Sequence, residues 1–304
     1  MKTYQRSRLT ACTAGSLALV AAVAVSGCGS SGGEQKNAVA PQSTPAAGPP
    51  SSAAPSTAAT PPPAAGDGQV SAAAWAKWHL QPLPAAPAPP ADKPVKLGRT
   101  GQVPVISAIP TSDKVVFVTI DDGEEKDPKF IEMMNDLKIP VTMFLMDDAI
   151  KNDYGYFKPL QAAGNHIQNH TLHHPAMSTK SAVVQKNEVC GDQQVLSQQY
   201  GAAPFLFRPP YGDGANTATL NSAVQQCGPR AVVLWRETMQ IHDMQYQAGD
   251  KKLKPGDIIL AHFRGPKDLK GETMTEMFGE LLSRIQEQGF SVARLEDYIQ
   301  PPAG

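Results

Sequence analysis

The sequence predicts an α/β fold in which a parallel β-sheet closes, or nearly closes, into a barrel surrounded by helices. From Lys114 onward, short apolar runs rich in β-branched residues alternate with amphipathic helical segments about seven times in roughly 200 residues. Polar or charged residues follow most of these runs, at the positions where the strands of a barrel would end. A doubly wound open sheet is the alternative arrangement for the same alternation.

Seven apolar runs are the expected strands. They are residues 115–120, 141–146, 166–169, 205–209, 231–235, 257–262 and 290–294. Helical periodicity marks segments between them, such as 127–138, 178–200 and 272–288. The last of these helices is expected to stop at Gly289, because glycine readily adopts the backbone conformation that ends a helix.

Residues 1–28 have the layout of a lipoprotein signal peptide. Lys2, Arg6 and Arg8 precede an apolar run that is too short to span a bilayer comfortably as a helix. The run ends in VSGC, which resembles the bacterial lipobox, whose cysteine (here Cys28) is lipidated and becomes the first residue of the mature protein. We therefore expect a lipid-anchored protein on the extracellular face of the cell membrane. An ordinary cleaved signal is the alternative, and the protein is secreted if Cys28 is not acylated.

Residues 29–95 are expected to form a disordered linker. They are rich in Pro, Ala, Ser, Thr and Gly and contain half of the chain's 28 prolines. Such a segment cannot bury enough apolar surface to offset the entropy of ordering it. Residues 96–304 are then the folded domain. The stretch AAAWAKWHL, with Trp75 and Trp78, is either a short helix docked on the domain or on lipid, or an unstructured sticky patch.

Charge and cysteine content agree with an exported protein. The formal net charge of -1 offers no reason to expect a nucleic-acid partner, and we expect a monomer. Cys12 lies in the apolar run of the signal and Cys28 is the lipidation site, which leaves Cys190 and Cys227 in the folded part. In an oxidising compartment these two are candidates for a disulfide, although the sequence does not establish the distance between them.

Reactive side chains follow the expected strands, so they should meet at one rim of the sheet. They are Asp121 and Asp122 after the first strand, the histidines after the third, residues 208–211 after the fourth, residues 235–237 after the fifth and His262 after the sixth. In both candidate folds the active site lies at the carboxyl ends of the strands. This convergence predicts an enzyme.

The segment NHTLHHP suggests a metal site. Two histidines about one helical turn apart, with a carboxylate from another strand, make the three-ligand set of a catalytic zinc that keeps one position open. The spacing leaves open whether His170 acts with His173 or with His174, and whether Asp121 or Asp122 supplies the carboxylate. A histidine-rich loop satisfied by hydrogen bonds or solvent, and a simple DDG turn, are the alternatives.

Adjacent residues of an extended strand point to opposite faces, so Asp121 and Asp122 are expected to point apart and to do different jobs. One can bind the metal while the other accepts a proton.

Four motifs in this order resemble those of polysaccharide deacetylases of the NodB-homology type, carbohydrate esterase family 4. They are TIDDG at 119–123, HTLHHP at 170–175, RPPYG at 208–212 and LAH at 260–262. The resemblance covers about Lys114 to Ile299. It implies a distorted (β/α)7 barrel with a divalent metal that removes N-acetyl groups from a cell-wall or extracellular polysaccharide of N-acetylglucosamine-type units, releasing acetate.

The resemblance also implies a role for each matching residue. The implied metal ligands are Asp122, His170 and His174. The implied catalytic residues are Asp121 as general base, Arg208 orienting it, Tyr211 offering its backbone N–H to the oxyanion, and His262 as general acid. The implied substrate contacts are Pro210, Tyr211, Trp235 and Leu260, and Leu260 would line an acetyl pocket. His166 and His173 receive no role. Two imidazoles and a carboxylate suit zinc, and cobalt, nickel or manganese are the other candidates.

The sequence departs from the family pattern in three places. Ile120 stands where the family usually has phenylalanine, and Glu124 where it has proline. After the fifth strand the family shows aspartates, one of which tunes the catalytic histidine, whereas this chain reads LWRETMQIHD over 234–243. Glu237, or else Asp243, is the available substitute.

Two arginines near the rim suggest a further hypothesis. Arg236 and Arg264 are candidates to bind an acidic group of the substrate, such as a lactyl carboxylate or a phosphate. An ordinary ion pair with Glu237 or a neighbour is the alternative for Arg236. Two other functions stay open: a glycan-binding protein with weak or no catalysis, and a deacylase of another ester or amide.

Overall fold

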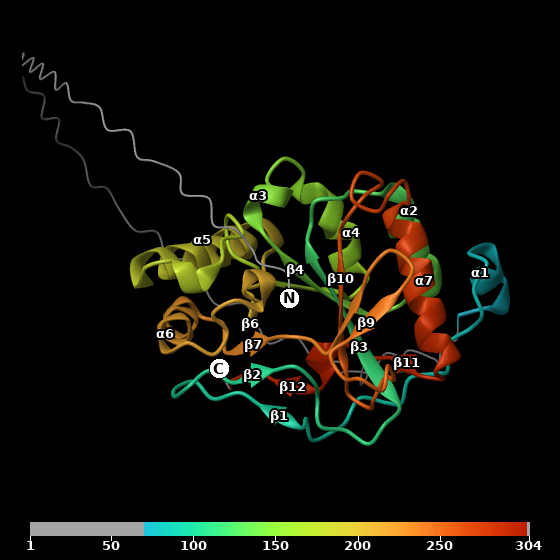
Figure 1. The fold of residues 1–304 in the computed structure, drawn as a ribbon, viewed down its shortest axis with the longest axis horizontal. Helices are drawn as coiled ribbons and strands as arrows, with labels where there is room; N and C mark the ends of the chain where they lie inside the picture. Colours follow the sequence, from blue (N-terminus) through green and yellow to red (C-terminus); the bar gives the residue numbers. More distant parts are fainter. Residues whose placement is uncertain (1–69, 303–304) are drawn as a thin grey trace, which may run out of the picture. The chain divides into compact units, whose positions relative to one another are not determined.

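The structure is a computed structural model that describes residues 70–302 (Figure 1). The expected signal peptide with Cys28 and the linker residues 29–69 lie outside the described residues. Within the described part, no helix has the length and apolar character needed to cross a membrane.

All seven expected strands are present and lie in one sheet. They are β3 (Val115–Asp122), β4 (Val141–Leu145), β5 (His166–Asn169), β6 (Leu206–Phe207), β7 (Ala231–Val233), β10 (Ile258–His262) and β11 (Ser291–Val292). Three more strands belong to the sheet: β2 (Val105–Ile106), β8 (Glu237–Met239) and β9 (Met244–Tyr246). All pairings are parallel except that of β8 with β9, and the strand order is β2-β7-β6-β5-β4-β3-β10-β8-β9, with β11 beside β3. A separate pair joins β1 (Val95–Lys96) to β12 (Ile299–Gln300).

The sheet is curled but not closed by continuous strand pairing. Its ends are β2 and β9, which are not paired to each other. A single antiparallel bridge from Ala108, just after β2, to Asp257, just before β10, joins the two sides. The prediction of a distorted β/α barrel is therefore confirmed.

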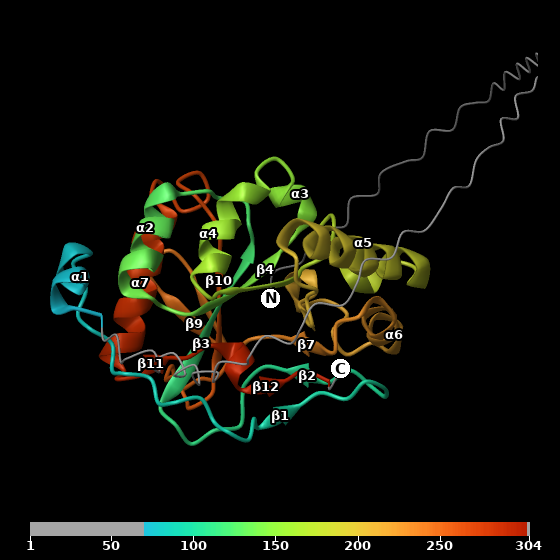
Figure 2. The same ribbon diagram turned by 180° about the vertical axis from the view of Figure 1, so that it is seen from behind.

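Helices surround the sheet on its outside (Figure 1 and Figure 2). The three expected ones are α2 (Pro128–Leu137), α5 (Ala182–Tyr200) and α7 (Met274–Glu287); the others are α1 (Ala72–Lys77), α3 (Asp147–Ile150), α4 (Phe157–Ala162) and α6 (Ala218–Cys227), with short 3-10 turns at Tyr154–Tyr156, Met177–Thr179, Pro210–Gly212 and Leu295–Asp297. The sequence specifies their ends. Thr273 and Glu276 form a reciprocal capping box at the start of α7, and Gly201 ends α5 with φ of 71°.

The two faces of β3 build different layers of the molecule. Val116, Val118 and Ile120 pack against the outer helices, whereas Phe117 lies in the barrel interior with Ile258. The register of β3 with β10 places Thr119 beside Leu260, one layer above Phe117. The next layer up is the rim. The interior-facing side chains of β3 therefore form successive layers, and the last layer lies at the carboxyl end of the barrel.

Residues 70–95 correct the predicted boundary of the linker. Trp75 is 5% exposed and belongs to the main hydrophobic core, and the Trp78 indole N–H donates to Asp136 at 2.9 Å. Lys77 forms an ion pair of 2.6 Å with Glu132 of α2. Disorder was expected because the average composition of 29–95 is proline-rich. A few aromatic and apolar residues nevertheless dock α1 on the domain, which was one of the two interpretations of AAAWAKWHL.

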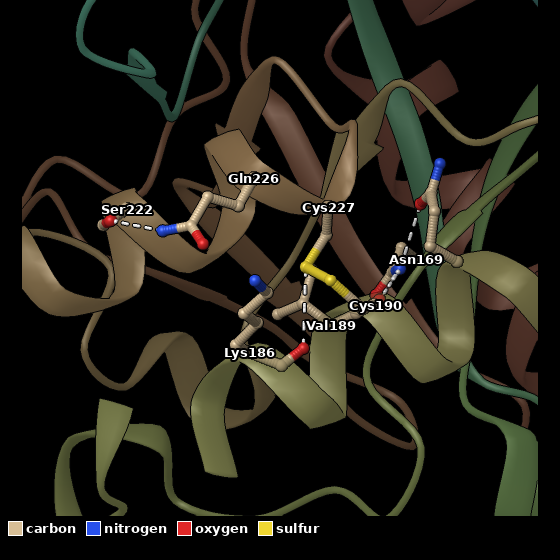
Figure 3. Close-up of a disulfide and its surroundings, with 8 residues drawn as sticks. Asn169, Lys186, Val189, Cys190, Ser222, Gln226 and Cys227 are labelled. Carbon is tan, nitrogen blue, oxygen red and sulfur yellow. Dashed lines mark hydrogen bonds between the residues drawn. A yellow bond between two sulfur atoms is a disulfide. The ribbon is translucent and has the colours of Figure 1, made fainter. Parts of the chain in front are cut away.

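Cys190 and Cys227 form a disulfide between α5 and α6, with their Cα atoms 4.7 Å apart (Figure 3). The predicted pairing is confirmed. Because α5 follows the histidine loop and α6 follows the RPPYG segment, the bond ties together the helices that support two motifs of the rim.

Candidate metal and catalytic site

Three of the predicted ligands converge at the rim. One donor atom from each of Asp122, His170 and His174 lies within 4.8 Å of the others. The Asp122 Oδ1 atom is 3.4 Å from His170 Nε2 and 3.3 Å from His174 Nε2. Donor atoms bound at roughly 2.1 Å around a tetrahedral metal stand about 3.4 Å apart, so the observed spacings fit such an ion.

Of the two histidine pairs that the spacing left open, the structure brings together His170 and His174. The His173 ring is 58% exposed and its Nδ1 bonds Glu188 at 2.9 Å. Neither His173 nor the exposed His166 belongs to the group of potential metal donors.

The state of Asp122 supports a cation site. Its Oδ1 atom is buried and has no hydrogen-bond partner in the described part of the chain, although buried acceptors in proteins are nearly always satisfied. Burial raises the pKa of Asp122, but the neighbouring His170 and His174 outweigh burial and hold this pKa below its usual range. An ionised, unsatisfied oxygen facing two imidazoles fits a divalent metal.

Both histidines are oriented by their second ring nitrogen. The His170 Nδ1 atom lies 2.7 Å from the Arg208 carbonyl, which can only accept, so this nitrogen carries the proton and Nε2 keeps its lone pair. The His174 Nδ1 atom lies 3.2 Å from the Tyr211 hydroxyl. Such partners of the distal nitrogen are typical of metal-binding histidines. The residues of this chain therefore fit the metal that the motifs imply.

The expectation that Asp121 and Asp122 point apart is wrong. The His170 Nε2 atom lies 3.6 Å from Asp121 Oδ2 as well as 3.4 Å from Asp122 Oδ1. Asp122 has φ of 75°, a left-handed conformation that interrupts the alternation of the strand and turns both carboxylates toward the same centre. Gly123 follows with φ of 95°, and a Cβ atom there would stand 2.5 Å from Ile150 Cγ2, so only glycine fits.

Helix α5 holds the loop that carries the histidine ligands. The His170 backbone N–H donates to Asp192 at 3.1 Å, and the His173 backbone N–H donates to Glu188 at 2.9 Å. The Asn169 side chain donates to the Val189 carbonyl at 2.9 Å, next to the disulfide (Figure 3).

These bonds stabilise an unfavourable backbone. Thr171 and His174 have φ of 76° and 54°, which is uncommon for side chains of this kind. The sequence reasoning did not find Asp192 and Glu188. The only sign of them in the sequence is that two acidic residues lie four apart on a helix. Such a pair ordinarily indicates a solvent-exposed helix face.

Arg208 fixes the position of the second carboxylate. Its side chain is fully buried, and Nη1 donates to Asp121 Oδ1 at 2.6 Å and to Thr119 Oγ1 at 2.8 Å. Its Nε–H donates to the Val233 carbonyl at 2.9 Å, and its guanidinium lies over the Phe144 ring. A charged group held this firmly leaves Asp121 one orientation, as the motif match implied.

His262 lies beside Asp121 at the end of β10. Burial is the largest influence on it and lowers its pKa to about 4, with Asp121 and Asp122 opposing the shift and Arg264 adding to it. Among residues 70–302, no carboxylate comes close enough to its ring to form an ion pair. The ring is therefore mostly neutral at every pH above about 4.

Glu237 does not lie beside His262. The prediction that Glu237 takes the place of the family aspartate next to the catalytic histidine is therefore wrong. The chain leaves the sheet after β7 and returns as β8, whose register places Glu237 opposite Ile259. There Glu237 lies near Asp257, and burial followed by this second acid raises the pKa of Glu237 to about 8. Arg236 forms an ion pair of 3.3 Å with Asp257. The interpretation of Arg236 as part of an ordinary ion pair is therefore confirmed, with Asp257 rather than Glu237 as its partner.

The other candidate, Asp243, lines a pocket of about 470 Å³ together with His262 and Arg264. The remaining predicted contacts lie close to the same rim. Tyr211 is 70% exposed with φ of 61°, Trp235 lies 5.5 Å from the Arg208 guanidinium, and Leu260 and Pro210 are buried. Among the described residues, the Tyr211 backbone N–H finds no backbone or side-chain acceptor.

Comparison with known proteins agrees with this geometry. The sequence profile of the polysaccharide deacetylase family matches residues 108–232. An uncharacterized protein of Streptomyces coelicolor is 39% identical over 197 residues, which cover 64% of this chain and 77% of that protein. A Bacillus cereus peptidoglycan-N-acetylglucosamine deacetylase is 27% identical over 63% of this chain and 70% of its own length.

A Bacillus subtilis peptidoglycan-N-acetylmuramic acid deacetylase is 22% identical over 62% of this chain and 73% of its own length. Among solved structures, a Bacillus anthracis pseudoenzyme of carbohydrate esterase family 4 matches with a TM-score of 0.53 and 19% identity, over 65% of this chain and 70% of that one. The last similarity concerns the fold alone.

Proposed function

The chain belongs to the polysaccharide deacetylase family, and from this premise we propose that it removes N-acetyl groups from a cell-wall or extracellular polysaccharide in a metal-dependent hydrolysis. The substrate units would be of the N-acetylglucosamine type, as for the named Bacillus cereus relative. The observation that carries the proposal is the convergence of Asp122, His170 and His174 next to the Arg208–Asp121 pair.

Zinc is the proposed metal, because two imidazoles and one carboxylate at tetrahedral spacing leave one position open. Cobalt, nickel or manganese would suit the same donors. The chemistry that a divalent ion supplies in such a site is polarisation of the acyl oxygen and a lowered pKa of the attacking water.

The side chains of this protein would supply the proton transfers. Asp121, held by Arg208, would accept a proton from the attacking water, and His262 would give one to the leaving nitrogen as the carbon–nitrogen bond breaks. The free Tyr211 N–H would donate to the developing oxyanion. Leu260, buried beside Thr119, would border the acetyl group, and Trp235 with the Pro210 turn would shape the opposite wall.

A second candidate function is glycan binding with weak catalysis. Within residues 70–302 His262 has no carboxylate partner, and its pKa is about 4, so little of it carries the proton that a general acid needs at neutral pH. This is the specific observation in favour of that candidate.

We also propose that the protein acts as a monomer without nucleic-acid partners, on the extracellular face of the cell membrane, anchored through a lipid on Cys28. The basic and apolar pattern of residues 1–28 and the proline-rich segment that follows support this placement.

Acetate release tests the activity. Wild-type protein loaded with zinc is expected to release acetate from N-acetylglucosamine oligomers and from peptidoglycan, to lose this activity on chelation and to regain it with zinc. Asp121→Asn should lower kcat by on the order of 10²–10⁴-fold without loss of metal. Bound glycan without acetate would favour the second candidate. Faster release from O-acetyl esters than from N-acetyl groups would assign a different acyl specificity.

A further inference from the structure

Arg264 places a guanidinium at the edge of the candidate reaction centre. It follows β10 two residues after His262, and its Nη2 atom lies 3.9 Å from Asp122 Oδ2. That distance is too long for a hydrogen bond. The side chain is 41% exposed, and among residues 70–302 no acceptor receives a hydrogen bond from it.

The two other arginines near the rim, Arg208 and Arg236, have partners within the protein. Arg208 donates to Asp121, Thr119 and backbone carbonyls in the core. Arg236 pairs with the buried Asp257 and lines a different pocket from His262. Arg264 thus keeps a planar fork of free donors directed to the site, while Arg236 does not. The structure separates the two arginines that the sequence suggested as a pair.

The space next to Arg264 is large enough for part of a substrate. The pocket of about 470 Å³ is lined by residues of the loop after β10 and of the hairpin of β8 and β9, and its volume is in the range of ordinary ligand sites. Lys270 adds a second cation to its lining, and Asp243 and Asp268 add two carboxylates. The formal charges of these four side chains balance, so the pocket as a whole does not attract anions.

Recognition of an anion here must therefore be local to Arg264. A guanidinium group binds a carboxylate through two parallel N–H···O hydrogen bonds, which favour one orientation of the ligand. A carboxylate held at this point would lie within a few ångströms of Asp122 and His262. It would consequently belong to the sugar unit under attack or to its direct neighbour.

We propose that Arg264 binds a carboxylate of the substrate, so that the enzyme prefers glycans that carry a carboxylate on the reacting sugar unit or on its direct neighbour to neutral glycans. This inference rests on the deacetylase function proposed above. Arg264 acts as a specificity residue: it selects the glycan, while Asp121 and His262 transfer protons.

Matched substrates test the selection. The probes are oligosaccharides of alternating N-acetylglucosamine and N-acetylmuramic acid with free lactyl carboxylates, and the same oligosaccharides with these groups converted to lactamides. The zinc-loaded full chain is expected to show kcat/KM about tenfold higher for the carboxylate form, the size of one charge-assisted interaction. The preference should reside mainly in KM.

Three variants connect the preference to Arg264. Arg264→Gln should bring the ratio between the two substrates close to one, and Arg264→Lys should keep part of it because lysine retains the charge but not the fork. Arg236→Gln is the matched control, since it removes an arginine that faces away from the pocket, and it should keep the wild-type ratio. Zinc content and Tm of each variant show whether it is folded.

The outcomes separate the two proposals. Equal kcat/KM of wild type on both substrates, or an unchanged ratio in Arg264→Gln, overturns the role of Arg264 while the deacetylase function stands. No acetate from either substrate by zinc-loaded wild type overturns the deacetylase function itself. Strands with peptide stems, in which the lactyl carboxyl is amide-linked, identify the source: a preference retained there assigns the recognised carboxylate to the peptide, and a preference lost there assigns it to the lactyl group.

Discussion

His262 on β10 and Asp121 on β3 occupy the same register position of two neighbouring parallel strands. Residues so paired are side by side at the same height of the barrel, here at the rim. The layer below them is Leu260 with Thr119, and Thr119 also accepts from Arg208. One strand pairing therefore sets the distance between the two residues proposed to transfer protons, without any loop between them.

Neighbouring histidines provide a matched test of the metal site. His174→Ala should abolish stoichiometric zinc binding, because it removes one of three donors. His173→Ala should leave binding intact, because that ring is directed toward Glu188. Isothermal titration calorimetry with zinc on the metal-free protein measures both. Equal losses in the two variants would contradict the assignment.

Asp192 should act on the metal through the His170 backbone. Asp192→Ala removes one of the two acceptors of the His170 N–H, the other being the Leu145 carbonyl, and is expected to lower zinc affinity by about 10–100-fold, the usual effect of a group that supports a ligand. The visible spectrum of the cobalt-loaded protein should change as the ligand loop relaxes. Gln226→Ala, which changes an exposed side chain of α6, is the control. An unchanged cobalt spectrum together with unchanged affinity would show that Asp192 is only structural.

Glu237 should make the protein less stable at alkaline pH. Its pKa is about 8 in the folded state, above the value of 4.5 for the free side chain, so between these values the folded state binds the extra proton. The free energy of unfolding therefore falls as pH rises from about 4.5 through 8, and the loss is complete above that.

Glu237→Gln keeps the shape of this buried side chain without its titration. The variant is expected to gain stability over wild type at pH 9 by on the order of 2 kcal/mol, and to differ little at pH 5. Urea unfolding at both values measures the difference. A variant that is equally affected at pH 5 and pH 9 would show that Glu237 does not titrate in this range.

The disulfide should stabilise the domain. It joins residues separated by 37 positions, and closing a loop of that size contributes about 3–4 kcal/mol through the unfolded state. Replacing Cys190 and Cys227 by alanine should therefore lower the free energy of unfolding by about this amount, as measured by urea denaturation. A reducing agent should have the same effect on wild type and none on the double variant.

Much of the fold could be read from local patterns. Each of the seven strands was an apolar run with a clear beginning and end, and hydrophobic periodicity depends only on neighbours along the chain. The rim could be inferred because parallel strands all end on one side. The sequence therefore predicts correctly that one rim carries Asp121, Asp122, His170, Arg208 and His262.

Other features depended on contacts between distant residues. The docking of Trp75 arises from a core more than forty residues further along the chain, which an average over a proline-rich segment hides. Glu237 was misplaced because no local pattern shows that β8 starts a new register after β7. The support of His170 by Asp192 is likewise a bond across 22 positions.

The sequence by itself determined which residues are available for chemistry and the order in which the strands present them, because both are properties of neighbouring residues. Only the tertiary structure decided their partners. It turned Asp122 toward Asp121 through one left-handed residue, selected His174 over His173, paired Glu237 with Asp257 and left Arg264 with free donors. Partners are set by packing and burial, which bring together groups that the chain keeps far apart.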